Sequence, residues 1–457
     1  MMDPKKRKIV IALMVAMFLA AVEGTVVTTA IPTIAKELKG LELISWIFSL
    51  YLLTSAISTP IYGKLSDLYG RKNILSVGIV IFIIGSSLCG LSANMYQLIA
   101  FRAVQGLGAG AIFTVTYTIV GDVFSLAERA KVQGWLSSVW GIASLAGPFV
   151  GGFLIDFFSW KWIFLINVPF GILSVILLQS SLQESFERKK HRIDYPGTLV
   201  LSAGIVALLY GVMAGERSGS WLSLPVLALL ALTPVLLVLF YFIEKRAQEP
   251  VVPFEIFTRT NIFANMISFL VCAVLIGIDV YIPIYIQSVL GLSATVSGLS
   301  LAPMSITWLV SSVLLSKAIP RYGERVVVAA SSLILVLSGL LLPALNGNAS
   351  LAVVIVYSTI AGIGFGGAFT TLTIVVQASV EYNKRGAATA SNSLIRTLGQ
   401  TVAISIFGTV FNSHMKISLD WALHTIFVIL IFINAACFLL SFTLSGGLKE
   451  KGGNGEK

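Results

Sequence analysis

Apolar segments of about 20 residues recur along the whole chain, and each is long enough to cross the roughly 30 Å hydrocarbon core of a bilayer. Only 11% of the 457 residues are charged, whereas a soluble domain carries about 25%. This composition excludes a cytosolic enzyme, a disordered protein and a secreted disulfide scaffold. The sequence therefore predicts an all-α integral membrane protein with 14 transmembrane helices. The expected spans are approximately 9–34, 43–65, 74–93, 97–120, 133–155, 162–182, 197–215, 221–243, 262–286, 296–316, 326–345, 351–378, 388–411 and 421–444.

The positive charges predict the orientation of these spans. Most Lys and Arg residues fall in the segments that share a side with Met1, and the opposite side holds only Lys36, Lys39, Lys161, Arg217 and Lys416. Because cytoplasmic loops are enriched in Lys and Arg, we expect both termini to be cytoplasmic. Loop charge also accounts for the net charge of +10, so no nucleic-acid partner is expected.

A long-range duplication divides the chain. Residues 63–72 align with 316–325, and Glu23 aligns with Asp279 at nearly the same offset. At the offset of Glu23 and Asp279, the glycines Gly106, Gly108 and Gly110 also align with Gly362, Gly364 and Gly366. We expect two six-helix bundles, at 1–182 and 261–445. Two inserted helices would lie between them at 183–260, and a disordered cytoplasmic tail would follow at 446–457. Parallel repeats are typical of transporters with a midplane substrate site between the halves; the alternative is a chance alignment of Gly-rich helices.

Two carboxyl groups lie within predicted spans. Glu23 and Asp279 each have apolar neighbours on one helical face. A charge at the bilayer centre costs at least about 2.5–3.5 kcal/mol, so such residues usually serve function. We interpret both as proton-coupling sites that can also attract a cationic substrate; the alternative is a protonated, structural carboxyl.

Two arginines also lie within spans. Arg102, with Gln105 on the same helix, is always charged and cannot carry the proton. We expect Arg102 to tune a nearby carboxylate or order a polar network; the alternative is a structural partner for backbone carbonyls. Arg396 and Asn392 form a polar stripe one turn apart, which could contact either the cavity or the 63–72 loop.

Several motifs carry a resemblance to a known family. The loop Gly63–Lys72 and the fourth-helix set around Arg102 and Gly106 resemble signatures of the major facilitator superfamily. The segment Gly147, Pro148, Gly151, Gly152 is similar to the fifth-helix signature of its antiporters, and residues 160–171 resemble a stretch of its fourteen-span drug:proton antiporters. Glu23 departs from the usual aspartate of the first-helix motif, and Pro320 replaces the acid of the second-half loop signature.

The resemblance implies a cytoplasmic gating latch. Its residues would be Gly63, Asp67, Gly70, Arg71, Asp122 and Arg129. Read from the residues alone, Asp67 could hold the positive end of a helix or pair with a cation; the alternative, a topogenic loop, explains Arg71 but not Asp67. The small residues at 147–152 suit close helix packing, and Pro148 suits a kink; ordinary membrane packing explains them equally well.

The functional expectation is a proton-coupled antiporter that exports amphipathic, cationic drugs by alternating access. Gln105, Phe113, Tyr117, Phe369, Asn392 and Arg396 are the candidate cavity residues. No spacing suggests a metal site and no P-loop is present, so the proton gradient is the expected energy source and no cofactor is expected. The expected partners are small molecules, protons and membrane lipids, and we expect a monomer. The resemblance implies the plasma membrane of a bacterium. Alternatives are an exporter of a lipid or metabolite and, in another class, a membrane receptor or lipid-modifying enzyme.

Overall fold

The computed structural model describes residues 3–124, 126–182, 194–218, 221–247, 254–347, 349–381 and 384–444. The side chains of Asp67, Arg129 and Pro148, and the predicted tail 446–457, lie outside the described part. The chain forms two compact units, Met1–Val251 and Val252–Lys457.

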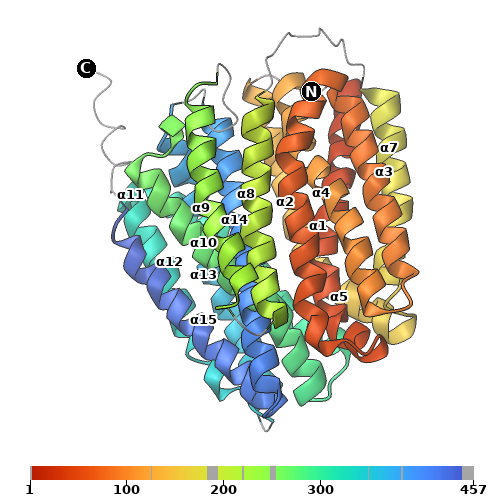
Figure 1. The fold of residues 1–457 in the computed structure, drawn as a ribbon, viewed down its shortest axis with the longest axis vertical. Helices are drawn as coiled ribbons and strands as arrows, with labels where there is room; N and C mark the ends of the chain where they lie inside the picture. Colours follow the sequence, from red (N-terminus) through yellow and green to blue (C-terminus); the bar gives the residue numbers. More distant parts are fainter. Residues whose placement is uncertain are drawn as a thin grey trace. The chain divides into compact units, whose positions relative to one another are not determined.

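The first unit contains the helices that carry Glu23 and Arg102 (Figure 1). Its elements are α1 (Pro4–Glu37), η1 (Leu41–Leu43), α2 (Ile44–Tyr69), α3 (Arg71–Gly90), α4 (Met95–Val123), α5 (Leu126–Phe157), α6 (Trp162–Leu165), α7 (Asn167–Ser181), α8 (Tyr195–Ser218) and α9 (Leu224–Glu244). Helices α8 and α9, which correspond to the predicted insert, pack against each other, and α8 also contacts α2.

The second unit contains the helices that carry Asp279 and Arg396. Its elements are η2 (Phe254–Ile256), α10 (Arg259–Ile284), a π-helical turn η3 (Tyr285–Val289), α11 (Ala294–Tyr322), α12 (Glu324–Gly339), η4 (Leu342–Ala344), α13 (Leu351–Ala378), α14 (Arg385–Met415) and α15 (Leu419–Ser441). A helix is present at each of the fourteen predicted spans.

In the described part of the chain, 13 helices are long and apolar enough to cross a membrane. The predicted span 133–155 falls in α5, a helix of 32 residues several of whose side chains are outside that part. Over the described residues the structure contains no strand. The prediction of an all-α membrane protein is therefore confirmed.

The same packing scheme occurs in both units. In the first, α4 packs against α2 and α3, and α1 packs against α5 and α7. In the second, α13 packs against α11 and α12, and α10 packs against α14 and α15. The helices correspond in chain order, so the duplication seen in the sequence is a duplication of packing.

The aligned glycines explain how α4 and α13 approach their neighbours. A Cβ atom at Gly106 would collide with Thr54 and the backbone of Tyr51 on α2, and one at Gly108 would collide with α3. In the second unit, a Cβ atom at Gly362 would collide with Met304 on α11. Small residues thus let both central helices contact the backbones of their neighbours.

Candidate functional site

A buried ion pair lies inside the first unit. Glu23 on α1 and Arg102 on α4 are each 1% exposed, and Arg102 Nη1 donates to Glu23 Oε1. The attraction between opposite charges is much stronger in such an environment than in water. The two residues singled out from the sequence as intramembrane charges are therefore brought together.

Arg102 has further partners besides Glu23. Its Nη1 donates to Gln105 Oε1 at 2.8 Å, and its Nε donates to the backbone carbonyl of Ile47 at 3.3 Å. Its guanidinium group also lies 4.1 Å from the ring centroid of Tyr51, close enough for a cation–π interaction. The arginine is thus held by α1, α2 and its own helix.

The site also contains two residues, Asn167 and Ser86, that the sequence analysis did not assign to it. Asn167 Nδ2 donates to Glu23 Oε2 at 2.7 Å and to Ser86 Oγ at 3.0 Å. Ser86 Oγ also accepts from Gln105 Nε2 at 3.1 Å. Asn167 lies within the tryptophan-rich motif of residues 160–171, which was the available signal for it; no feature of the sequence distinguishes Ser86.

Asp279 is in a different environment from its counterpart Glu23. It is half-buried on α10 in the second unit. Within the described residues, no hydrogen bond or ion pair to its carboxyl group is found, and Ser358 stands where the first unit has Arg102. The two aligned carboxyl groups therefore differ in their partners.

The loop between α2 and α3 contains part of the predicted latch. Arg71 Nε donates to Asp122 Oδ2 at 2.6 Å, and Arg71 Nη1 donates to Ser66 Oγ at 2.8 Å. Ser66 Oγ donates in turn to the carbonyl of Gly63 at 2.7 Å. Gly70, at the junction of α2 and α3, has φ 92°, a conformation that favours glycine.

The latch prediction is therefore only partly addressed by the geometry. Arg71 and Asp122 are brought together across α3 and α4. The side chains of the other two charged members, Asp67 and Arg129, lie outside the described part.

The Gly147–Gly152 segment packs on α1 close to Glu23. A Cβ atom at Gly147 would collide with the side chain of Thr25, and one at Gly151 would lie 3.0 Å from the backbone of Val26. Thr25 Oγ1 donates to the carbonyl of Ala143 at 3.1 Å. Gly152 is buried. This segment thus sets the contact between α5 and the helix that carries the carboxyl group.

Arg396 in the second unit is associated with an aromatic cluster. It donates from Nη2 to Thr373 Oγ1 at 2.9 Å, and its guanidinium lies 4.9 Å from the ring centroid of Phe369. Phe369 stacks on Trp308 with centroids 4.9 Å apart. Arg396 and Phe369, predicted separately, therefore form one cluster.

Asn392 contacts a different group of polar residues. It donates to Asn265 Oδ1 at 2.7 Å and to Ser268 Oγ at 3.1 Å. Asn392 and Arg396 thus have separate partners although they share one stripe on α14.

Two other candidate cavity residues lie in the first unit. The ring of Phe113 stacks on that of Trp140 with centroids 5.8 Å apart, and Tyr117 is 45% exposed.

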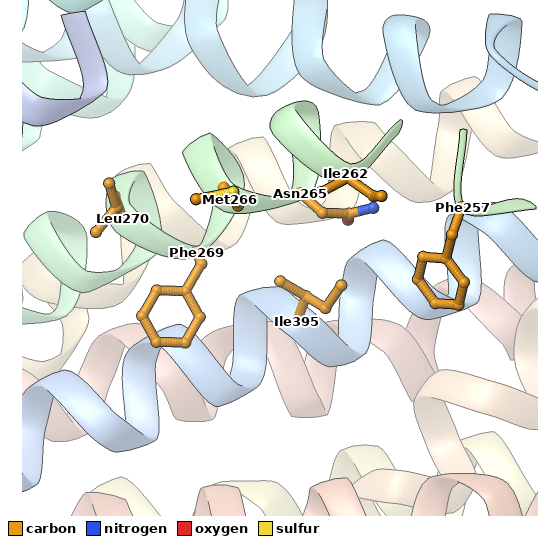
Figure 2. A pocket seen from close by; sticks show the side chains of 7 residues that line it. All are labelled: Phe257, Ile262, Asn265, Met266, Phe269, Leu270 and Ile395. Atoms are coloured by element: carbon orange, nitrogen blue, oxygen red, sulfur yellow. The ribbon is translucent and has the colours of Figure 1, made fainter. Parts of the chain in front are cut away.

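A cavity of about 320 Å³ lies beside Asn265 within the second unit. Figure 2 shows side chains of α10 on one side of it and Ile395 of α14 on the other. Its lining is formed by Phe257, Ile262, Asn265, Met266, Phe269, Leu270 and Ile395. The cavity is apolar apart from one amide, and Asn265 already accepts from Asn392.

Similarity to known proteins agrees with this architecture. Residues 13–404 match the model of the Major Facilitator Superfamily. The chain is 35% identical over 410 residues to the multidrug transporter protein MdtP of Bacillus subtilis, covering 90% of this chain and 76% of that protein. It is 30% identical to the multidrug efflux pump SdrM of Staphylococcus aureus over 88% of this chain and 89% of that protein.

A solved structure shares the fold. A bacterial homologue of the human lysosomal transporter Spinster, in an inward-facing and occupied conformation, superposes with a TM-score of 0.71 and 15% identity, over 98% of this chain and 99% of that one. The family match spans most of the chain, and relatives above 30% identity are transporters rather than enzymes. The chain is therefore a multi-pass membrane transporter and belongs to the Major Facilitator Superfamily.

Proposed function

We propose that this protein is a proton-coupled antiporter that exports amphipathic, cationic drugs across the plasma membrane by alternating access. The observation that carries the proposal is the buried Glu23–Arg102 pair with its hydrogen-bonded neighbours. The relatives named as multidrug transporters support the substrate class.

Glu23 is the proposed exchange site for a proton and a cation. A carboxylate can bind either, and both neutralise the same charge, so each displaces the other. Arg102 keeps its interactions with Gln105, Ile47 and Tyr51 when Glu23 is neutral. The arginine can therefore stay in place while the carboxyl group changes its protonation state.

Asp279 is the proposed second proton site. Because it lacks an arginine partner in the described part of the second unit, its protonation does not require breaking an ion pair. In this proposal, Glu23 distinguishes cationic from neutral substrates, and Asp279 contributes to proton coupling for both.

The Arg71–Asp122 pair is proposed as part of a latch that forms and breaks during the transport cycle. It is well suited to this role because it joins two segments at a turn and its members are partly exposed, at 18% and 53% for the side chains. Exposed pairs contribute only about 0–1 kcal/mol, so the latch can open at little cost. The proposed topology places this turn and both termini in the cytoplasm.

The test is transport by the purified protein in proteoliposomes with an imposed proton gradient. Export of a labelled cationic dye should require the gradient, collapse with a protonophore and be unaffected by a non-hydrolysable ATP analogue. Parallel arms with a neutral drug, a phospholipid and a small metabolite identify the substrate class. Export that persists after the gradient is dissipated would reject proton antiport.

A further inference from the structure

The hydrogen bonds around Glu23 have a fixed direction. A guanidinium group can only donate, and a backbone carbonyl can only accept. Because Arg102 donates to Gln105 Oε1 at 2.8 Å, the Gln105 amide presents Nε2 to Ser86 Oγ at 3.1 Å. Ser86 in turn donates its only hydroxyl proton to the carbonyl of Phe164 at 2.8 Å. The polarity of the network is thus set at both ends.

This polarity determines the orientation of the Asn167 amide. Since the Ser86 proton is already donated, Ser86 Oγ accepts from Asn167 Nδ2 at 3.0 Å. The same nitrogen donates to Glu23 Oε2 at 2.7 Å, and Arg102 donates to the other carboxylate oxygen. Both oxygens of Glu23 therefore face donors, which suits a carboxylate and leaves a proton on Oε2 without an acceptor.

We propose that the side-chain amide of Asn167 rotates by half a turn when Glu23 is protonated, so that Asn167 Oδ1 accepts the proton of Glu23. This inference rests on the proposed function, in which Glu23 binds the proton. An asparagine amide is nearly symmetric in shape, so rotation exchanges donor and acceptor without repacking. Asn167 is then a positioning residue that provides the appropriate hydrogen bond to each protonation state.

The neighbours of Asn167 can follow this rotation. Once Oδ1 faces Ser86, the Ser86 hydroxyl can turn its proton from Phe164 to Asn167 while still accepting from Gln105. The Phe164 carbonyl keeps the backbone N–H of Ile166 as a donor. Glu23 and Ser86 both remain hydrogen-bonded in either state, which matters because an unsatisfied buried polar group is costly.

The proposal predicts that Asn167→Leu affects both protonation states. Leucine has the same number of side-chain heavy atoms and the same branching as asparagine but can neither donate nor accept a hydrogen bond. We expect gradient-driven export to fall about tenfold across the pH range, as expected for an unsatisfied buried group. Ser174→Ala is the matched control: it removes a buried 3.0 Å hydrogen bond between α7 and Ala12 on α1, far along the helix from Glu23. Export by this control should be within about twofold of wild type.

Infrared difference spectra between high and low pH on the full-length protein test the rotation directly. The carboxyl group of Asp279 should give a protonated-carboxyl band that is absent in Asp279→Asn, and that of Glu23 a second such band that is absent in Glu23→Gln. In Asn167→Leu this band should move to higher wavenumber, because the carboxyl O–H has lost its acceptor, whereas Ser174→Ala should leave it in place. In wild type labelled with ¹³C-asparagine, an asparagine carbonyl band should shift with the carboxyl band.

The outcomes separate this inference from the proposed function. A carboxyl band that disappears in Glu23→Gln but does not move in Asn167→Leu overturns the rotation and leaves the proton site intact. A labelled asparagine carbonyl that is unchanged between the two pH values also overturns it, without relying on any variant that must fold. A Glu23→Gln spectrum that keeps every protonated-carboxyl band of wild type removes the proton from Glu23 and therefore rejects both.

Discussion

At the scale of single residues, the two units have the same packing but different charge. Glu23 is fully buried and paired with Arg102, whereas Asp279 is half-buried and Ser358 occupies the position of the arginine. A duplicated fold fixes where a side chain lies along its helix but not which partner it has. The two carboxyl groups can therefore serve different steps.

Substitution of each carboxyl group should have a different effect on transport. We expect Glu23→Gln to abolish export of cationic drugs and only weaken export of neutral ones, because the charge that attracts the cation is lost. Asp279→Asn should shift the pH dependence of transport for both kinds of substrate. A pH series of drug-driven proton release measures both effects. Identical profiles for the two variants would reject this division of roles.

Breaking the buried pair from one side should destabilise the protein. Arg102→Met leaves Glu23 without its partner, and removal of one member of a buried pair typically costs about 3–5 kcal/mol. The double variant Glu23→Gln, Arg102→Met removes both charges and should recover most of this loss. Thermal unfolding in detergent measures the difference; a double variant less stable than Arg102→Met would contradict the argument.

The sequence identified the charged residues of this site and Gln105, and missed Ser86 and Asn167. Glu23 and Arg102 were predicted because a charge within an apolar span is rare and costly. Asn167 contacts Glu23, and Ser86 contacts Asn167 and Gln105, but uncharged polar residues are common in membrane helices and often hydrogen-bond within their own helix. Their role depends on how α7 packs beside α1 and α3, which local sequence does not determine.

At the scale of helices, the contacts of α4 depend on the absence of side chains at its glycines. Gly106 lies against the backbone of Tyr51, whereas a Cβ atom at Gly121 on the same helix would meet nothing within 4 Å. Backbone atoms cannot move aside as a flexible side chain can. The two positions therefore differ sharply in the space they offer.

These two glycines provide a matched pair of variants. Gly106→Ala should force α4 away from α2 and cost about 1–3 kcal/mol, as overpacking does. Gly121→Ala should be neutral or stabilising by up to about 1 kcal/mol, because alanine favours helix. Unfolding temperatures of the two variants provide the comparison, and equal changes would show that the α2–α4 contact yields easily.

The N-terminal ends of corresponding helices are joined by ion pairs of opposite polarity. Lys6 of α1 pairs with Glu128 of α5 at 2.7 Å, whereas in the second unit Glu255, before α10, pairs with Lys384 at the start of α14. The hydrogen bond from Lys384 to Glu255 raises the pKa of the Lys384 ammonium group. The position of the contact is thus repeated although its charges are exchanged.

At the scale of the whole chain, the places of the spans along the sequence were predictable but the packing of one helix against another was not. Span length follows from membrane thickness, so each predicted span contains a helix. Which helices pack together depends on contacts far apart in sequence. The aligned glycines of α4 and α13 indicated a duplication without naming α2, α3, α11 and α12 as the neighbours.

The orientation of the chain in the membrane is the remaining prediction at this scale. The distribution of Lys and Arg places both termini in the cytoplasm and the α14–α15 turn outside. Cysteine labelling suits a test because Cys89, Cys272 and Cys437 are all buried. One added cysteine at each of three exposed positions, Ile417→Cys, Arg259→Cys and Lys5→Cys, probes the two sides.

In intact cells, a membrane-impermeant maleimide should label Ile417→Cys, which is 74% exposed in the α14–α15 turn. Arg259→Cys, at the start of α10, and Lys5→Cys, at the start of α1, should be labelled only after the membrane is permeabilised. Wild type gives the background from the buried thiols. Labelling of Lys5→Cys in intact cells would invert the topology and place the Arg71–Asp122 turn outside, where it could not act as a cytoplasmic latch.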